Sequence, residues 1–206
     1  LVHESQADAL VERMVRRARA IRIGDPLDLT TQLGPLVSQR QLDRTEQYVE
    51  LGRREGALLA CGGRRPDGPL AAGFYYEPTI FTNVEPSMRI AQDEIFGPVT
   101  CVLTYRDLDE AVRIANGIEF GLAASIWTAD TARGMKLAEG LECGIIWIND
   151  HHRIDPALPW GGMKDSGIGR EAGFEGYHEY TQTKSVVVNL DDPVDWYGTD
   201  EIVRLS

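Results

Sequence analysis

The stretch from residue 149 to residue 173 holds the densest group of side chains that can do chemistry. It reads NDHHRIDPALPWGGMKDSGIGREAG, with titratable groups first, then an aromatic residue and five glycines. Groups such as His151, His152 and Asp155 can bind a metal ion, but neighbouring histidines on a loop rarely point at one ion. No Glu-x-x-His or His-x-x-x-His spacing accompanies them. The sequence therefore predicts no metal site and favours a polar loop that lines a cleft or forms salt bridges at its rim.

Two glycine-rich segments in this stretch invite comparison with phosphate-binding loops. GIGREAG (167–173) has one residue too many before its third glycine for a dinucleotide fingerprint, and it does not follow a strand-like run. GGMKDSG (161–167) lacks the GK[ST] ending of a phosphate loop. Both segments favour a tight, irregular turn in which glycine permits positive φ and close backbone packing.

A third candidate is QDEIFGPV (92–99), which leads into a strand-like run. The Glu94 carboxylate and the Phe96 ring, followed by a Gly-Pro turn, can hold ribose hydroxyls with one group and a flat ring with the other. By composition alone, the alternative is a simple turn before a strand, with an N-capping acid.

The three cysteines, Cys61, Cys101 and Cys143, lie within or beside apolar runs without a nearby histidine. This setting favours buried, inert thiols over a nucleophile. Three scattered cysteines are also too few for a disulfide framework or a zinc site, which suits a reducing compartment.

The elements that must position these groups follow from the hydrophobic spacing. A helix is expected from Ser5, as its N-cap, until Gly24 stops the pattern. A second helix is expected to begin at Ser38, whose capping-box partner is Gln41, and to end before Gly56. A loop joins the two helices.

From residue 99 onwards, apolar strands alternate with short helices. The runs 99–105, 122–128 and 143–149 are strand-like, and 107–116 and 130–141 between them are helix-like. The first of these helices is expected to be capped by Asp107 with Glu110. This order is typical of βαβαβ units with parallel strands buried on both faces. The predicted fold class is α/β, an open twisted parallel sheet with flanking helices, and ligands bind such sheets at the carboxyl ends of the strands.

The last part of the chain departs from this rhythm. Residues 184–190 (KSVVVNL) read as a lone β-branched strand, which usually adds to a sheet edge in the same chain or in a neighbouring subunit. Residues 191–206 are acidic and irregular and are expected to form a surface tail.

Charge and hydropathy exclude several classes of partner. The 206 residues carry a formal net charge of −11, so no basic field exists to bind nucleic acid or an anionic membrane surface. No apolar run approaches the roughly 20 residues that span a bilayer, and the first residues lack the pattern of a signal peptide. We expect a cytoplasmic protein.

Six motifs, in order and spacing, carry a resemblance to a known family. They are GPLVS (34–38), YEPTIF (76–81), EIFGPV (94–99), FGLAASIWT (120–128), IWIN (146–149) and PWGGMKDSGIGREAG (159–173). With them, residues 1 to about 190 resemble the C-terminal part of the NAD(P)-dependent aldehyde dehydrogenase superfamily. The resemblance implies a chemistry in which a cysteine thiolate attacks the aldehyde, hydride passes to the nicotinamide, and a water activated by a glutamate hydrolyses the thioester.

The resemblance also implies roles for single residues. Glu94 matches the glutamate that hydrogen-bonds the nicotinamide ribose, and Phe96 matches the aromatic residue beside the nicotinamide end. Gln41 and Arg44 match positions that approach the adenosine ribose. The positions expected to line the aldehyde pocket are His151, His152, Ile154 and Trp160. Residues 184–190 match the strand that joins a partner subunit's sheet, which implies a homo-oligomer.

The match departs from the family at its start. The family's nucleophilic cysteine lies just upstream of the segment that LVHES matches, and its general-base glutamate and nucleotide-binding domain lie further upstream. We therefore expect no catalytic residue in this chain, no activity from it alone, and no NAD or NADP bound to it alone, although the full-length enzyme uses one of these cofactors. The alternative function is a non-catalytic module that keeps the fold for oligomer assembly or cofactor contact.

The predicted organisation has four parts. Residues 1–165 form the C-terminal portion of the catalytic domain, 166–183 a connecting helix or linker, 184–190 the oligomerisation strand and 191–206 the acidic tail.

The identity of the aldehyde substrate stays open at this point. A tryptophan at position 160 belongs to a cation-binding aromatic box in aminoaldehyde and betaine-aldehyde enzymes of the family, whereas His151, His152 and Arg153 favour a neutral aromatic or carboxylate-bearing substrate.

Overall fold

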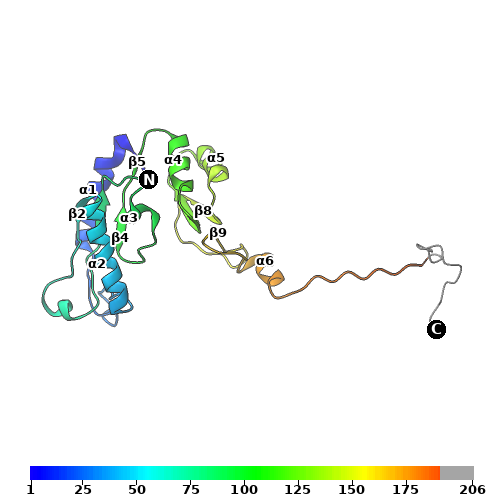
Figure 1. The fold of residues 1–206 in the computed structure, drawn as a ribbon, viewed down its shortest axis with the longest axis horizontal. Helices are drawn as coiled ribbons and strands as arrows, with labels where there is room; N and C mark the ends of the chain where they lie inside the picture. The colour runs from blue at the N-terminus through cyan, green and yellow to red at the C-terminus, as the bar shows by residue number, and fades with distance from the viewer. Residues whose placement is uncertain (191–206) are drawn as a thin grey trace.

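The computed structural model describes residues 1–190, and the predicted acidic tail at 191–206 lies outside the described residues. Helices and strands alternate along most of the chain (Figure 1). The strands are β1 (Val2–His3), β2 (Leu58–Cys61), β3 (Thr79–Thr82), β4 (Val99–Cys101), β5 (Thr104–Tyr105), β6 (Phe120–Gly121), β7 (Ala123–Ile126), β8 (Ile145–Ile148) and β9 (Met163–Lys164). The helices are α1 (Ala7–Ala20), α2 (Gln39–Arg54), α3 (Arg89–Gln92), α4 (Leu108–Asn116), α5 (Thr131–Gly140) and α6 (Gly173–His178), with short 3-10 turns at Glu4–Gln6 and Gly68–Ala72.

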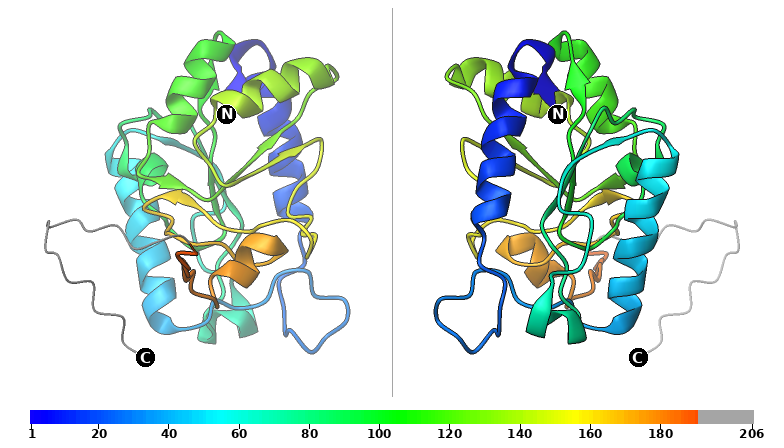
Figure 2. Two further views of the ribbon diagram at one scale, coloured as in Figure 1. Left: turned by 90° about the vertical axis from the view of Figure 1, so that its right-hand side faces the viewer. Right: turned by 90° about the vertical axis from the view of Figure 1, so that its left-hand side faces the viewer.

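The core lies on both faces of the three-stranded sheet β2-β3-β4, with α1 and α2 on opposite sides of it (Figure 2). Successive side chains of a strand point to opposite faces. Phe81 accordingly belongs to the core beneath α2, where it is fully buried beside Leu42. Its neighbour Ile80 packs on the other face with Cys61 and the apolar side of α1. Ile95 of the turn at 93–97 belongs to the same core as Leu42 of α2, so this core joins the turn to that helix.

The α/β class with open sheets and flanking helices is confirmed, but the strands divide among four short sheets. Strands β7 and β8 pair in parallel, as the βαβ pattern predicts, with Ser125 opposite Trp147. The predicted strand 99–105 is wrong as a single element. Its first half pairs with β3 and its second half with β1, because the backbone changes partner at Val102 and Leu103.

Two of the predicted helix starts are confirmed and one is wrong. Ser38 caps α2 by accepting a hydrogen bond from the Gln41 amide, and Asp107 caps α4 in the same way. Ser5 does not cap α1, because it sits inside the preceding 3-10 turn, where its amide donates to the His3 ring. The helix α1 also ends earlier than predicted, at Ala20.

Residues 184–190 form no strand within the described chain and run away from the body in Figure 1. Val187 and Leu190 are both 91% exposed. Pairing of this segment with a partner subunit stays a prediction, as do the domain boundaries, although α6 does lie within the predicted connecting part. No helix of residues 1–190 is both long and apolar enough to cross a membrane.

Candidate functional site

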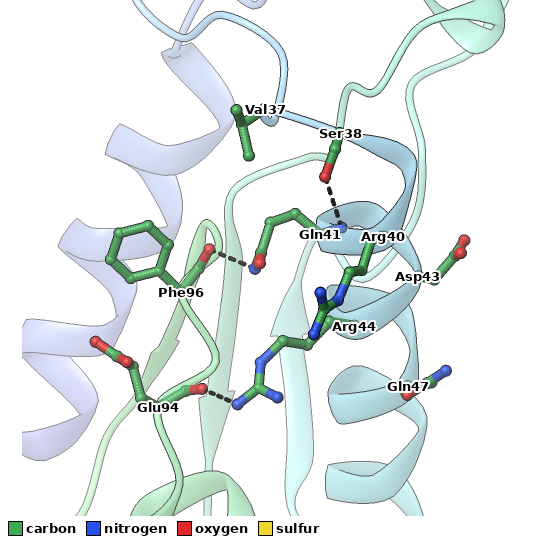
Figure 3. A pocket seen from close by; sticks show the side chains of 9 residues that line it. All are labelled: Val37, Ser38, Arg40, Gln41, Asp43, Arg44, Gln47, Glu94 and Phe96. Carbon is green, nitrogen blue, oxygen red and sulfur yellow. Dashed lines mark hydrogen bonds between the residues drawn. The ribbon is translucent and has the colours of Figure 1, made fainter.

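The turn at residues 93–97 is held against one face of α2 (Figure 3). The Gln41 side-chain amide donates hydrogen bonds to the carbonyl oxygens of Ile95, at 2.9 Å, and Phe96, at 2.7 Å. One turn further along the helix, the Arg44 guanidinium donates to the carbonyl oxygen of Glu94. The helix therefore grips the backbone of this turn at three consecutive residues.

The spacing of the α2 residues explains how they reach the turn together. Residues three and four apart lie on the same helix face, so Gln41, Arg44, Thr45 and Tyr48 all point toward the turn. Gly97 allows the closest approach, because a Cβ atom there would lie 2.5 Å from the Thr45 hydroxyl. The Thr45 side chain is fully buried and donates to the Gln41 carbonyl at 2.9 Å.

The side chains that the turn presents are exposed. Phe96 is 72% exposed and has a φ of 56°, in the region that L-residues rarely adopt. Within residues 1–190 the Glu94 carboxylate makes no hydrogen bond or ion pair, and in Figure 3 it projects, like the Phe96 ring, to the side away from α2. An open cavity of about 880 Å³ lies beside them. It is lined by Val37, Ser38, Arg40, Gln41, Asp43, Arg44, Gln47, Glu94 and Phe96.

This arrangement suits a ligand that carries hydroxyl groups and a flat ring. A free carboxylate accepts hydrogen bonds from a ribose diol, and an exposed aromatic ring at a fixed position offers a face to stack on. The structure thus brings together Gln41, Arg44, Glu94 and Phe96, the four residues predicted to bind the cofactor. It also shows that Gln41 and Arg44 use side-chain donors to hold the turn.

A second cluster gathers four rings, one from β8 itself and three from the loop that follows it. Trp147 lies 6.0 Å from Trp160 between ring centroids, and His152 stands edge-on to Trp160 at 6.1 Å. His151 lies 5.7 Å from Trp147, and its Nδ1 is 2.9 Å from the Ser125 hydroxyl. Trp160 is placed by paired backbone hydrogen bonds with Glu171. Three of the four predicted pocket residues are therefore adjacent.

The remaining predicted pocket residue, Ile154, is 54% exposed. The sequence reasoning missed Trp147, whose indole N–H donates to the Arg153 carbonyl at 2.8 Å and so shapes the same loop. The signal was present, because Trp147 is the last aromatic residue of a strand, at the end where ligands bind in α/β sheets. Within residues 1–190, no three His, Cys, Asp or Glu side chains gather as metal ligands.

The glycine-rich segment 161–173 packs tightly and contains the short strand β9, which pairs antiparallel with β6. A Cβ atom at Gly144 would lie only 1.6 Å from the Gly161 carbonyl oxygen, so the two segments touch through their backbones. Arg170 donates to the carbonyl oxygens of Gly162 and Gly169 and closes the turn. These contacts fit the predicted irregular turn.

Burial affects the three cysteines of this chain in the same direction. Burial raises the pKa of the Cys101 thiol to about 11 and raises the pKa values of Cys61 and Cys143. The thiolate is the reactive form, so burial disfavours the reactive form of all three thiols.

Comparison with known proteins shows which family the chain is similar to. Residues 1–186 match the model of the aldehyde dehydrogenase family. A betaine aldehyde dehydrogenase from Brucella anthropi is 48% identical over 190 residues, which cover 92% of this chain and 39% of that protein. The chain thus spans about two fifths of the length of the curated relatives it matches.

Solved structures give the same result. A point mutant of betaine aldehyde dehydrogenase from Staphylococcus aureus, in complex with NAD+, superimposes with a TM-score of 0.93 at 38% identity, over 96% of this chain and 41% of that one. An aldehyde dehydrogenase from Mycobacterium tuberculosis, also complexed with NAD+, gives a TM-score of 0.89 at 42% identity, over 94% and 40% of the respective chains. The chain belongs to the aldehyde dehydrogenase family.

Proposed function

We propose that this chain provides the cofactor-ribose contacts and part of the aldehyde pocket of an NAD-dependent aldehyde dehydrogenase. The observation that carries the proposal is the turn at 93–97, which α2 holds by its backbone while it presents a free carboxylate and an exposed ring. Solved relatives that contain NAD+ support NAD as the cofactor.

The residues of this chain bind and orient. NAD+, when bound, accepts a hydride from the substrate carbon. The Glu94 carboxylate accepts hydrogen bonds from ribose hydroxyls, and the Phe96 ring packs beside the nicotinamide end. The raised pKa values of the three cysteines of this chain support an attacking thiol that lies outside them.

The proposed substrate is an aldehyde with a cationic head group. The rings of Trp147 and Trp160, 6.0 Å apart, offer faces that attract a quaternary ammonium by cation–π interaction. The relatives named betaine aldehyde dehydrogenase support this choice. The neighbouring His152 and Arg153 favour the alternative, a carboxylate-bearing or neutral aromatic aldehyde.

The test of the cofactor role is the variant Glu94→Gln in the enzyme that contains this chain. Loss of a charged acceptor for ribose hydroxyls raises the KM for NAD+ by about tenfold or more. The matched control is Glu119→Gln, an exposed glutamate whose carboxylate also lacks a partner within residues 1–190. An unchanged KM for NAD+ in Glu94→Gln contradicts the proposal.

We expect the 206-residue chain alone to make too few contacts to bind NAD+ measurably. A micromolar affinity for NAD+ in a titration of that chain contradicts this expectation.

The test of the substrate is the ratio of kcat/KM values for betaine aldehyde and benzaldehyde. Trp160→Ala lowers this ratio about threefold to tenfold if the tryptophan binds the cation. Trp127→Ala is the control, since Trp127 is 69% exposed and belongs to no ring cluster among the described residues. A ratio that stays constant in Trp160→Ala, or an initial preference for the aromatic aldehyde, contradicts a cationic substrate.

The exposed row of apolar side chains at 184–190 supports a second part of the proposal, assembly with another copy of the chain. The segment runs away from the body in Figure 1, and Val186, Val187 and Val188 are 78%, 91% and 70% exposed. Exposed β-branched residues of this kind suit a strand that adds to the sheet of another subunit. Val187→Lys tests it by light scattering after size exclusion. The control is Val37→Lys, at a valine outside the segment that is 87% exposed, against 91% for Val187. A larger monomer fraction in Val187→Lys alone is expected, and equal oligomer states contradict the assignment.

A further inference from the structure

The turn at 93–97 is held at a fourth residue, Asp93, which directly precedes Glu94. The Tyr48 hydroxyl, on α2, donates a hydrogen bond to Asp93 Oδ2 at 2.9 Å. Arg89, at the start of α3, donates to the same oxygen from Nε at 3.0 Å and Nη2 at 2.6 Å. Asp93 therefore joins the turn to two helices, immediately before the residue proposed to bind the cofactor ribose.

Tyr48 also contacts the residue that holds Glu94. The Arg44 guanidinium carbon lies 4.8 Å from the centroid of the Tyr48 ring, and Arg44 Nη2 lies 3.4 Å from the Tyr48 hydroxyl oxygen. The Tyr48 side chain is only 9% exposed, so it has little freedom to move. Tyr48 thus contacts both Asp93 and Arg44, and Arg44 in turn donates to the Glu94 carbonyl oxygen. We call Tyr48, Asp93 and Arg44 the clamp.

The protonation states suit this clamp. Burial, followed by the hydrogen bond to Asp93, raises the pKa of Tyr48, and so the phenol keeps its proton. The Tyr48 hydrogen bond, followed by Arg89, lowers the pKa of Asp93, and so the carboxylate stays ionised. The donor and the acceptor therefore keep their roles throughout the neutral range.

We propose that Tyr48 and Asp93 are positioning residues for the cofactor, which fix the turn so that the Glu94 carboxylate and the Phe96 ring meet NAD+ already in place. This inference rests on the proposed function of the turn. A site that is ordered before binding loses less conformational freedom on binding. Without the clamp, cofactor binding itself must order the turn, and affinity for NAD+ falls.

The kinetic test uses the enzyme that contains this chain. Tyr48→Phe keeps the ring under Arg44 and removes only the hydroxyl. We expect the KM for NAD+ to rise about threefold to tenfold, while the KM for the aldehyde is unchanged. The matched control is Tyr105→Phe, because the Tyr105 hydroxyl has no hydrogen-bond partner within residues 1–190. A uniform loss of activity, with KM for NAD+ unaltered, indicates a merely structural role and overturns the proposal.

Asp93 variants add a rescue. Asp93→Ala removes the anchor, whereas Asp93→Asn keeps a carbonyl oxygen that can accept from Tyr48. We expect Asp93→Asn to raise the KM for NAD+ less than Asp93→Ala does. Equal effects of the two substitutions overturn the role given to the Tyr48 hydrogen bond.

A measurement without cofactor separates this inference from the proposed function. In the 206-residue chain, amide order parameters of residues 94–97 should lie near the value of about 0.85 for rigid backbone and fall toward about 0.6 in Tyr48→Phe. If Glu94→Gln leaves NAD+ kinetics unchanged while the order parameters fall, the proposed function fails and the clamp stands. If Glu94→Gln weakens NAD+ use while Tyr48→Phe alters neither KM nor order parameters, only the positioning inference fails.

Discussion

Substitution of Gly97 by alanine tests how closely the turn must approach α2. The new Cβ atom would lie 2.5 Å from Thr45 Oγ1, 3.2 Å from Cγ2 and 3.4 Å from Cβ, so its three nearest neighbours belong to one side chain. Thr45 is fully buried, and rotation of its hydroxyl would break the 2.9 Å hydrogen bond to the Gln41 carbonyl. The turn must move instead. Overpacking of this kind costs about 1–3 kcal/mol.

The assay is urea denaturation of the purified chain, with thermal melting alongside. Gly97→Ala should lower the free energy of unfolding by about 2 kcal/mol, which corresponds to a melting temperature lower by about 4–8 °C for a chain of this size. The control is Gly34→Ala, where the nearest atom to the new Cβ is Pro26 Cβ at 3.7 Å. That ordinary contact should change stability by less than about 0.5 kcal/mol.

A double-mutant cycle decides whether the clash is the cause. Thr45→Ala removes the two atoms that crowd the new methyl group most closely. If the reasoning holds, Gly97→Ala and Thr45→Ala together cost less than the sum of the single variants, by about 1–2 kcal/mol. Additivity within about 0.5 kcal/mol refutes the contact between turn and helix as the origin of the effect.

Three further outcomes are expected. Alkylation of the native chain at pH 8 should be slow at Cys61, Cys101 and Cys143, whose pKa values are raised by burial, and fast for all three after unfolding; rapid labelling of the native chain at any of them refutes this. Burial raises the pKa of Tyr76 to about 12, so its contribution to stability is present below pH 10 and is lost as the pH rises toward 12; a free energy of unfolding that stays constant from pH 9 to 12 contradicts it. Ser38→Ala should lower the free energy of unfolding by about 1 kcal/mol, as loss of a helix N-cap does, and urea denaturation measures it.

The features that the sequence predicted well are local ones. Ser38 and Asp107 cap helices because a hydroxyl or carboxylate three residues before a backbone amide satisfies that amide directly. The pairing of β7 with β8 follows from two apolar runs separated by one short helix. The capping signals lie within three residues of each other, and the two strands are joined by a single short helix, so neighbouring sequence is enough to interpret them.

The features that it predicted poorly depend on distant partners. The run 99–105 is split because β3 and β1, from elsewhere in the chain, each pair with one half of it. The grip of α2 on the turn joins Gln41 to Ile95, 54 residues away. The family resemblance made Gln41 and Glu94 candidates for cofactor contacts. Only the folded chain shows that Gln41 supports the turn that presents Glu94.

Because α2 holds the turn through backbone carbonyl oxygens, the shape of the turn does not depend on which side chains it carries. Every amino acid carries a carbonyl oxygen, so the hydrogen bonds from Gln41 and Arg44 to residues 94–96 survive a change of side chain on the turn. Under the proposed function, side chains of the turn can be exchanged while its backbone hydrogen bonds are kept, so the turn is a place at which to engineer a different cofactor preference. Position 94 accepts any side chain in this respect, whereas the φ of 56° at position 96 favours glycine, asparagine or aspartate and excludes β-branched residues.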